Sequence, residues 1–225
     1  MSLHAPRVSG TELSDRIEPR PVRHTEIAMH GAVWDVRRDT VDLGEAGGEV
    51  VREYVEHTGA VAVLALRSDR GADEVLLIQQ YRHPVGALEW EIPAGLLDVT
   101  GEPAQEAAAR ELGEEADLVA GRWAVLVDYV SSPGGNTEAL RVYLATGLSE
   151  VPEGERHERE AEEAGMPVCW VDLAEAVDAV LAGRLRNSTA AIAALAAQRS
   201  RELGWASLRP VDDPWPSQPA GRTDD

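Results

Sequence analysis

Two long apolar runs, at residues 59–68 and 74–83, place the strongest constraint on the fold of this chain. The runs read GAVAVLALRS and EVLLIQQYRH, and a polar turn at residues 69–73 separates them. Strands with one exposed face alternate apolar and polar residues, whereas nearly continuous apolar runs are typical of strands that are covered on both faces. We therefore predict two neighbouring strands at the centre of a layered domain.

Helix-like and strand-like segments alternate around these runs. Residues 103–116 are rich in Ala, Leu and Glu, which favour a helix, and Pro103 is expected in its first turn. Further helices are expected at residues 174–183 and 188–203, and further strands at residues 123–132, 140–148 and 166–173. The pattern predicts an α/β or α+β sandwich in which helices cover a mixed sheet.

Composition divides the chain into four parts. Residues 1–22 form an N-terminal segment, expected to be flexible, without the apolar run of a signal peptide. Residues 23–58 form a β unit that is rich in Val, Ile, Trp and Tyr, residues 59–204 form the main domain, and residues 205–225 form a Pro-rich C-terminal tail. The β unit has only about 35 residues, too few for a stable core of its own, so we expect it to pack on the main domain or on a second subunit. A dimer would satisfy that need.

The charged residues exclude several classes of protein. The chain has 40 acidic and 21 basic residues, for a formal net charge of -19, and all of the basic residues are Arg. Without Lys there is no Walker-type phosphate loop, pyridoxal Schiff base or amine nucleophile. The surplus of negative charge also disfavours nucleic acids and anionic membranes as partners, and no apolar run is long enough to span a bilayer. The single Cys169 cannot form an internal disulfide, which favours a cytoplasmic location.

Three acidic residues of the predicted helix at 103–116 could share a ligand. Glu111 and Glu115 lie on one helical face, Glu114 is one turn from Glu111, and Arg110 stands four residues before Glu114. Carboxylates this close repel one another, and a bound divalent cation is one reason to keep them together. The alternative is an acidic helix face that is simply solvated.

The segment from residue 95 to residue 118 resembles the Nudix box, a loop-helix-loop signature. Gly95, Glu102 and the run Arg110–Glu115 match its Gly, its first Glu and its Arg-Glu-x-x-Glu-Glu core. Six residues rather than five separate Gly95 from Glu102, and Asp117 stands where the signature closes with Gly. Asp can adopt the left-handed conformation of a helix C-terminal Gly at some cost.

The resemblance implies a Nudix-type α/β/α sandwich that binds Mg²⁺ or Mn²⁺ and hydrolyses a pyrophosphate bond. Glu111 and Glu115 would be the main metal ligands and Glu114 a further ligand, with Arg110 as an orienting partner and the Ala94 carbonyl as a backbone ligand. The role of Glu102 stays open, because an acid expected in the first helical turn could contact the metal shell or simply favour the helix dipole.

From Trp34 to Leu185 the chain is similar to the ADP-ribose pyrophosphatases among the Nudix hydrolases, particularly those of actinobacteria. Segments such as QQYRHPVGALEWEIPAGLLD and SSPGGNTEALRVYLATGL occur in the same order. This likeness implies cleavage of ADP-ribose into AMP and ribose 5-phosphate by a homodimer that exchanges its N-terminal β units. The alternatives are the same chemistry on another nucleoside diphosphate sugar, or a non-catalytic Nudix module that senses nucleotides.

The same likeness implies residues for substrate binding. Trp34 and Arg52 would sandwich the adenine, one from each subunit, and Arg82 would meet the diphosphate or the terminal ribose. Glu91 and Leu96 would line the same pocket. The plainer alternatives are a buried Trp, a surface Arg and an ion-paired Arg at a strand end.

In that subfamily an acidic loop supplies the catalytic base. Counting back from Trp170 aligns Glu163 with the base, and a shift of the alignment would select Glu158, Glu160 or Glu162 instead. A solvated, inert loop is the remaining alternative.

Overall fold

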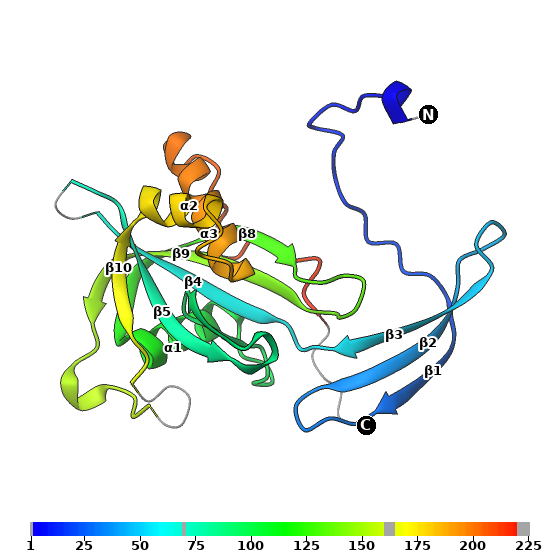
Figure 1. Cartoon of the computed structure of the whole chain (residues 1–225), viewed down its shortest axis with the longest axis horizontal. Coiled ribbons are helices and arrows are strands. Elements are labelled where there is room, and N and C mark those ends of the chain that lie inside the picture. Colours follow the sequence, from blue (N-terminus) through cyan, green and yellow to red (C-terminus); the bar gives the residue numbers. More distant parts are fainter. Residues whose placement is uncertain (1, 69–70, 160–164, 220–225) are drawn as a thin grey trace.

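Residues 2–68, 71–159 and 165–219 are described by the computed structural model of the chain. Its first part is a three-stranded antiparallel sheet in the order β1-β2-β3, which projects to one side of the main domain (Figure 1). The strands span Val22–Met29 (β1), Asp35–Asp42 (β2) and Glu49–Glu56 (β3). The expected N-terminal antiparallel sheet is therefore present.

The main domain is built on a mixed sheet in the order β10-β5-β4-β9-β8. Its strands span Ala60–Arg67 (β4), Glu74–Arg82 (β5), Leu118–Val130 (β8), Ala139–Glu150 (β9) and Val168–Asp172 (β10). Two short strands, Ala87–Glu91 (β6) and Ala94–Leu96 (β7), pair with β5 and β4. The pairing of β4 with β9 is parallel and the other pairings are antiparallel, as a mixed sheet requires.

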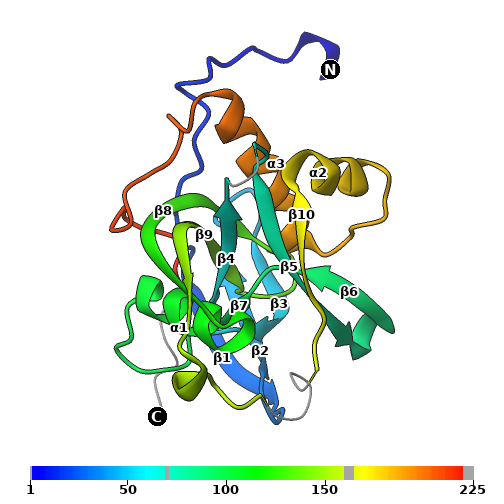
Figure 2. The same ribbon diagram turned by 90° about the vertical axis from the view of Figure 1, so that its left-hand side faces the viewer.

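In the described part of the chain, three α-helices cover the two faces of this sheet (Figure 2). They span Ala104–Ala116 (α1), Leu173–Leu181 (α2) and Ser188–Glu202 (α3), and short 3-10 turns occur at Ser2–His4, His83–Val85 and Glu153–Glu155. The side chains of Asp172 and Asn187 accept hydrogen bonds from the first backbone N–H groups of α2 and α3, so both helices begin at N-caps.

Strand β4 is buried on both faces, as its apolar sequence predicted. Val61 and Val63 belong to the cluster that contains Leu112 of α1, whereas Leu64 belongs to the cluster that contains Leu173 and the buried alanines of α3. Successive side chains of a strand point to opposite faces, so one strand contributes to both halves of the core. The α+β sandwich predicted from the sequence is confirmed.

Helix α1 begins and ends with residues that cannot simply extend it. Pro103 is the N-cap, with φ -63° and ψ 141°, rather than a residue of the first turn as we had predicted. Asp117 is the C-cap and has φ 54° and ψ 35°, the left-handed conformation that Gly supplies in the Nudix signature. Ala107, Ala108 and Leu112 are buried together with Glu115, so the face of α1 that packs on the domain also meets β7.

The chain after α3 returns along the main sheet. Arg209 forms a β-bridge with Val125 of β8. Buried Arg141 of β9 donates to the backbone carbonyls of Asp213 and Pro214 at 2.7 and 3.1 Å. These bonds fasten the Pro-rich segment across β8 and β9.

No helix within the described residues is long and apolar enough to cross a membrane.

Candidate active site

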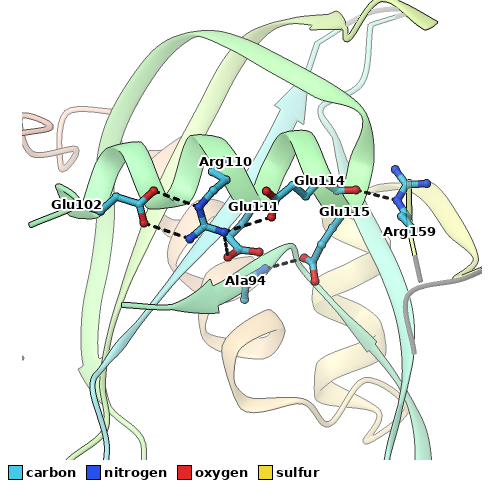
Figure 3. Close-up of polar contacts among 7 residues, drawn as sticks. All are labelled: Ala94, Glu102, Arg110, Glu111, Glu114, Glu115 and Arg159. Atoms are coloured by element: carbon cyan, nitrogen blue, oxygen red, sulfur yellow. Dashed lines mark hydrogen bonds and ion pairs between the residues drawn. The ribbon is translucent and has the colours of Figure 1, made fainter. Parts of the chain in front are cut away.

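Helix α1 places two of the predicted metal ligands, Glu111 and Glu115, against the backbone of strand β7 (Figure 3). Glu115 is 7% exposed, and its Oε2 accepts the backbone N–H of Ala94 at 2.9 Å. A Cβ on Gly95 would lie 1.9 Å from Oε1 of Glu111, so the carboxylate of Glu111 occupies the space that any side chain at residue 95 would need. Gly95 therefore allows helix and strand to approach closely enough to place both carboxylates together.

Arg110 lies at the centre of the acidic cluster (Figure 3). Its Nε and Nη2 donate to the two oxygens of Glu102 at 3.0 and 3.1 Å, a bidentate pair. Its Nη1 donates to Glu111 at 2.7 Å and to Glu114 at 3.2 Å. The hydrogen bond to Glu102, followed by the charge of Glu111, raises the pKa of the Arg110 guanidinium above its usual range. One permanently charged group thus holds three carboxylates in place.

The position of Glu102 corrects one premise of the sequence analysis. Glu102 precedes the N-cap Pro103, so it lies outside the first turn of α1, where Glu106 is the acidic residue. Its carboxylate faces Arg110 from the loop. In this structure Glu102 meets the cluster through its ion pair with Arg110.

Asp117 and Arg159 form a contact that sequence reasoning missed. The Nη2 of Arg159 donates to the Asp117 carboxylate. Its Nε donates to the backbone carbonyl of Glu114 at 2.8 Å, as Figure 3 shows. This ion pair gives Asp117 a role that Gly could not fill. The only signal in the sequence was the departure from the Nudix signature at Asp117.

The atoms of the cluster that could bind a metal are all oxygens, which suits Mg²⁺ or Mn²⁺. Glu115 meets Ala94 and Glu111 meets Gly95, so their carboxylates and the Ala94 carbonyl are the groups that could hold a cation, with Glu114 sharing Arg110 with Glu111. In residues 2–68, 71–159 and 165–219 as they stand, no three His, Cys, Asp or Glu side chains form a ready-made metal-binding group. Glu111 and Glu114 instead face Arg110, and a cation would draw on carboxylates that this arginine already gathers.

Arg82 and Glu91, two of the predicted substrate-binding residues, form a bidentate ion pair. The distances are 2.7 Å from Nε to Oε1 and 2.8 Å from Nη2 to Oε2. The Glu91 side chain is 6% exposed and the Arg82 side chain 44% exposed, so Glu91 anchors the arginine while part of the guanidinium faces outward. Leu96 lies on β7 opposite Ala60 and is partly buried.

Trp34 and Arg52 lie in the N-terminal sheet. The indole of Trp34, directly before β2, stacks on the imidazole of His57 with ring centroids 4.1 Å apart and an interplanar angle of 18°. Arg52 is exposed on β3 opposite Asp39. A sandwich with one residue from each subunit involves a second chain, so it remains a prediction.

The preferred catalytic base, Glu163, lies outside the described residues, as do Glu160 and Glu162. Glu158 is described and exposed. Arg159 is the last described residue before this gap, and its two bonds fix it to the C-terminal end of α1.

A cavity of about 910 Å³ lies elsewhere, at the far ends of β4 and β9. Its described lining includes Trp123, Trp170 and Trp205, and none of the predicted site residues. The carboxylates of the cluster lie instead at α1, beside β7.

Comparison with known proteins identifies the class to which this fold and the acidic helix α1 belong. The NUDIX domain family matches residues 56–195, more than half of the chain, and the protein belongs to this family. It is 48% identical over 195 residues to an ADP-ribose pyrophosphatase of Mycobacterium tuberculosis, which covers 87% of this chain and 90% of the relative. It is 36% identical over 137 residues to an ADP-ribose pyrophosphatase of Bacillus subtilis, covering 61% and 71%. A crystal structure of an ADP compounds hydrolase shares the fold, with a TM-score of 0.68 at 20% identity over 85% of this chain and 99% of that one.

Proposed function

We propose that this Nudix hydrolase cleaves the pyrophosphate bond of ADP-ribose, giving AMP and ribose 5-phosphate. The observation that carries the proposal is the meeting of Glu111 and Glu115 at Ala94 and Gly95, in a chain 48% identical to an ADP-ribose pyrophosphatase. Carboxylates alone would repel a diphosphate, so the cluster makes chemical sense only with a cation between them.

Mg²⁺ or Mn²⁺ is the proposed cofactor, held by Glu111, Glu114, Glu115 and the Ala94 carbonyl. When bound, such a cation neutralises the charge of the diphosphate and lowers the pKa of a water. The chain's own contribution is to hold the ligands. The Ala94 N–H fixes Glu115, and Arg110 gathers Glu111 and Glu114 nearby, so a cation would find these carboxylates on one helix and draw two of them from Arg110.

Glu163 is the proposed general base. It would accept a proton from the attacking water as the water oxygen bonds to one phosphorus, and the bridging P–O bond would break with its electrons leaving on the other phosphate. Arg159, the last described residue before Glu163, is held at the C-terminal end of α1 by its bonds to Glu114 and Asp117, which supports a base four residues further along the chain. Separate Glu→Gln variants at residues 158, 160, 162 and 163 test the choice. The base is the residue whose substitution removes the fall in hydrolysis rate at low pH.

Substrate binding is assigned to Trp34 and Arg52 for the adenine and to Arg82 for the diphosphate or the terminal ribose. Glu91 supports this role by holding Arg82 from a buried position, and Leu96 lies on the same strand as the Ala94 ligand. Arginine is the only permanently charged basic side chain that this sequence offers for phosphate, because it has no Lys.

A homodimer is the proposed assembly, with the N-terminal sheet shared between subunits. In one chain this sheet leaves large apolar side chains more than 40% exposed, namely Val22, Ile27, Met29 and Val51. Apolar surface of this kind is typical of subunit contacts. Light scattering should give twice the mass of the 24.3 kDa chain.

We also propose a cytoplasmic location, which suits a chain whose single Cys169 has no partner cysteine.

A substrate panel tests the proposal. The protein is incubated with Mg²⁺ and with ADP-ribose, another ADP-sugar, a UDP-sugar or no substrate, and the products are separated by chromatography. AMP from ADP-ribose at the highest kcat/KM supports the proposal. Faster cleavage of another nucleoside diphosphate sugar would reassign the substrate, and nucleotide binding without cleavage of any compound would indicate a sensing module.

A further inference from the structure

His57 connects the N-terminal sheet to the main domain. Its side chain is only 10% exposed, although it lies in the short connection between β3 and β4. Its imidazole forms the surface on which the indole of Trp34 stacks, at a centroid distance of 4.1 Å. The two rings are nearly parallel, at 18°, so the position of one largely determines the plane of the other.

Both nitrogens of the His57 ring have polar partners. Nδ1 accepts the backbone N–H of Gly59 at 3.0 Å, which leaves the proton of the neutral ring on Nε2. Nε2 lies 3.2 Å from Oε1 of Glu138. These two contacts add to the packing around a side chain that is only 10% exposed, and together they hold the ring in one orientation.

The backbone of His57 is fixed as firmly as its ring. Its N–H donates to the hydroxyl of Thr137 at 2.8 Å, and its carbonyl lies 3.1 Å from the same hydroxyl, which can donate to it. The loop between β8 and β9 therefore holds the backbone of His57 through Thr137 and its side chain through Glu138. Residues of β3, His57 and this loop form one rigid junction, and Trp34 rests on it.

A base that stacks on Trp34 must use the face of the indole that His57 does not cover. We propose that His57 is a positioning residue for the adenine end of the substrate: by supporting the covered face of Trp34, it sets the angle at which the other face meets the base. This inference rests on the proposed function, since it takes the ligand of Trp34 to be an adenine nucleotide. His57 would touch neither the base nor the phosphates.

The test compares two substitutions of similar size in the full-length protein. His57→Phe keeps a flat ring under Trp34 and loses the polar contacts, whereas His57→Leu fills the space without a flat ring. An aromatic pair is worth about three- to tenfold in an equilibrium constant, so His57→Leu should raise the KM for ADP-ribose by about that factor. His57→Phe should restore KM to within about twofold of the wild type, and kcat should change less than twofold in either variant. His4→Leu, in the exposed N-terminal segment, is the matched control.

Product binding separates a positioning role from a general defect. AMP carries the adenine and ribose 5-phosphate does not, so His57→Leu should weaken AMP binding by the same factor as KM and leave ribose 5-phosphate unchanged, both measured by calorimetry. Equal KM and AMP affinity in the Leu and Phe variants would overturn the inference, as would a loss confined to kcat. Calorimetry needs no turnover, so an inactive wild type would refute the proposed function while the AMP comparison would still decide the role of His57.

Discussion

Gly95→Ala should disable the enzyme without unfolding it. The new Cβ would lie 1.9 Å from Oε1 and 2.0 Å from Cδ of Glu111. Ordinary contact begins at roughly 3.5 Å, so the carboxylate must retreat by about 1.5 Å. The third atom in the way is Cγ of Glu111 at 2.6 Å, so all three belong to one flexible side chain, and Gly95 has no positive φ that would exclude Ala. We therefore expect the free energy of unfolding to change by less than about 1 kcal/mol.

The effect on activity should be much larger. A displacement of about 1 Å in a catalytic group can lower the rate about 100-fold, which corresponds to about 2.7 kcal/mol of transition-state stabilisation. We predict that kcat/KM for ADP-ribose falls at least about 100-fold and that the concentration of Mg²⁺ for half-maximal rate rises, as measured by AMP release and urea unfolding.

Gly113→Ala is the matched control. It makes the same chemical change in α1, where the nearest atom to the new Cβ is a carbonyl oxygen 4.0 Å away. It should leave kcat/KM unchanged and stabilise the protein by about 0.5–1 kcal/mol, because Gly is unfavourable inside a helix. If Gly95→Ala keeps wild-type activity, the close approach of Glu111 to residue 95 has no part in catalysis and the assignment of the site is wrong.

Three further predictions concern Glu115, Arg110 and His57. Glu115→Gln keeps an acceptor for the Ala94 N–H but removes the charge, so turnover should fall at least about 1,000-fold with an unchanged circular dichroism spectrum; wild-type turnover would exclude Glu115 as a ligand. Arg110→Lys cannot form the fork to Glu102, so half-saturation should require about 10- to 100-fold more Mg²⁺ in metal titrations, and an unchanged requirement would show that Arg110 does not orient the ligands. Burial lowers the pKa of His57 below its ordinary 6.5, although Glu138 opposes the shift. The unfolded chain then binds the proton first as pH falls, so stability from this group is complete above about pH 6.5 and is lost on further acidification. Between pH 7.5 and 5.5 the wild type should lose more unfolding free energy in urea titrations than His57→Phe, and equal losses would contradict this linkage.

Local patterns predicted the parts of this molecule that depend on local structure. The apolar run of β4 predicted burial on both faces, and the Ala- and Glu-rich segment predicted α1 with its acids on one side. The four-residue spacing of Arg110 and Glu114 also predicted their contact, because helix geometry alone brings them together.

Contacts between distant residues were beyond such patterns. Asp117 meets Arg159, 42 residues away, and His57 meets Thr137, 80 residues away, and no periodicity connects either pair. Glu102 was expected in the first turn of the helix. It lies two residues before α1 and faces Arg110 from the loop. In each case the partner is set by how the loops fold over the sheet, which depends on the packing of the whole domain.

The most direct measurement is the product analysis of ADP-ribose incubated with the purified protein and Mg²⁺. Chromatography should show AMP and ribose 5-phosphate in equal amounts, both dependent on the added cation and both absent with Glu115→Gln. Formation of no AMP with either Mg²⁺ or Mn²⁺, by protein that is folded and dimeric, would contradict the assignment of this carboxylate helix as an ADP-ribose pyrophosphatase site.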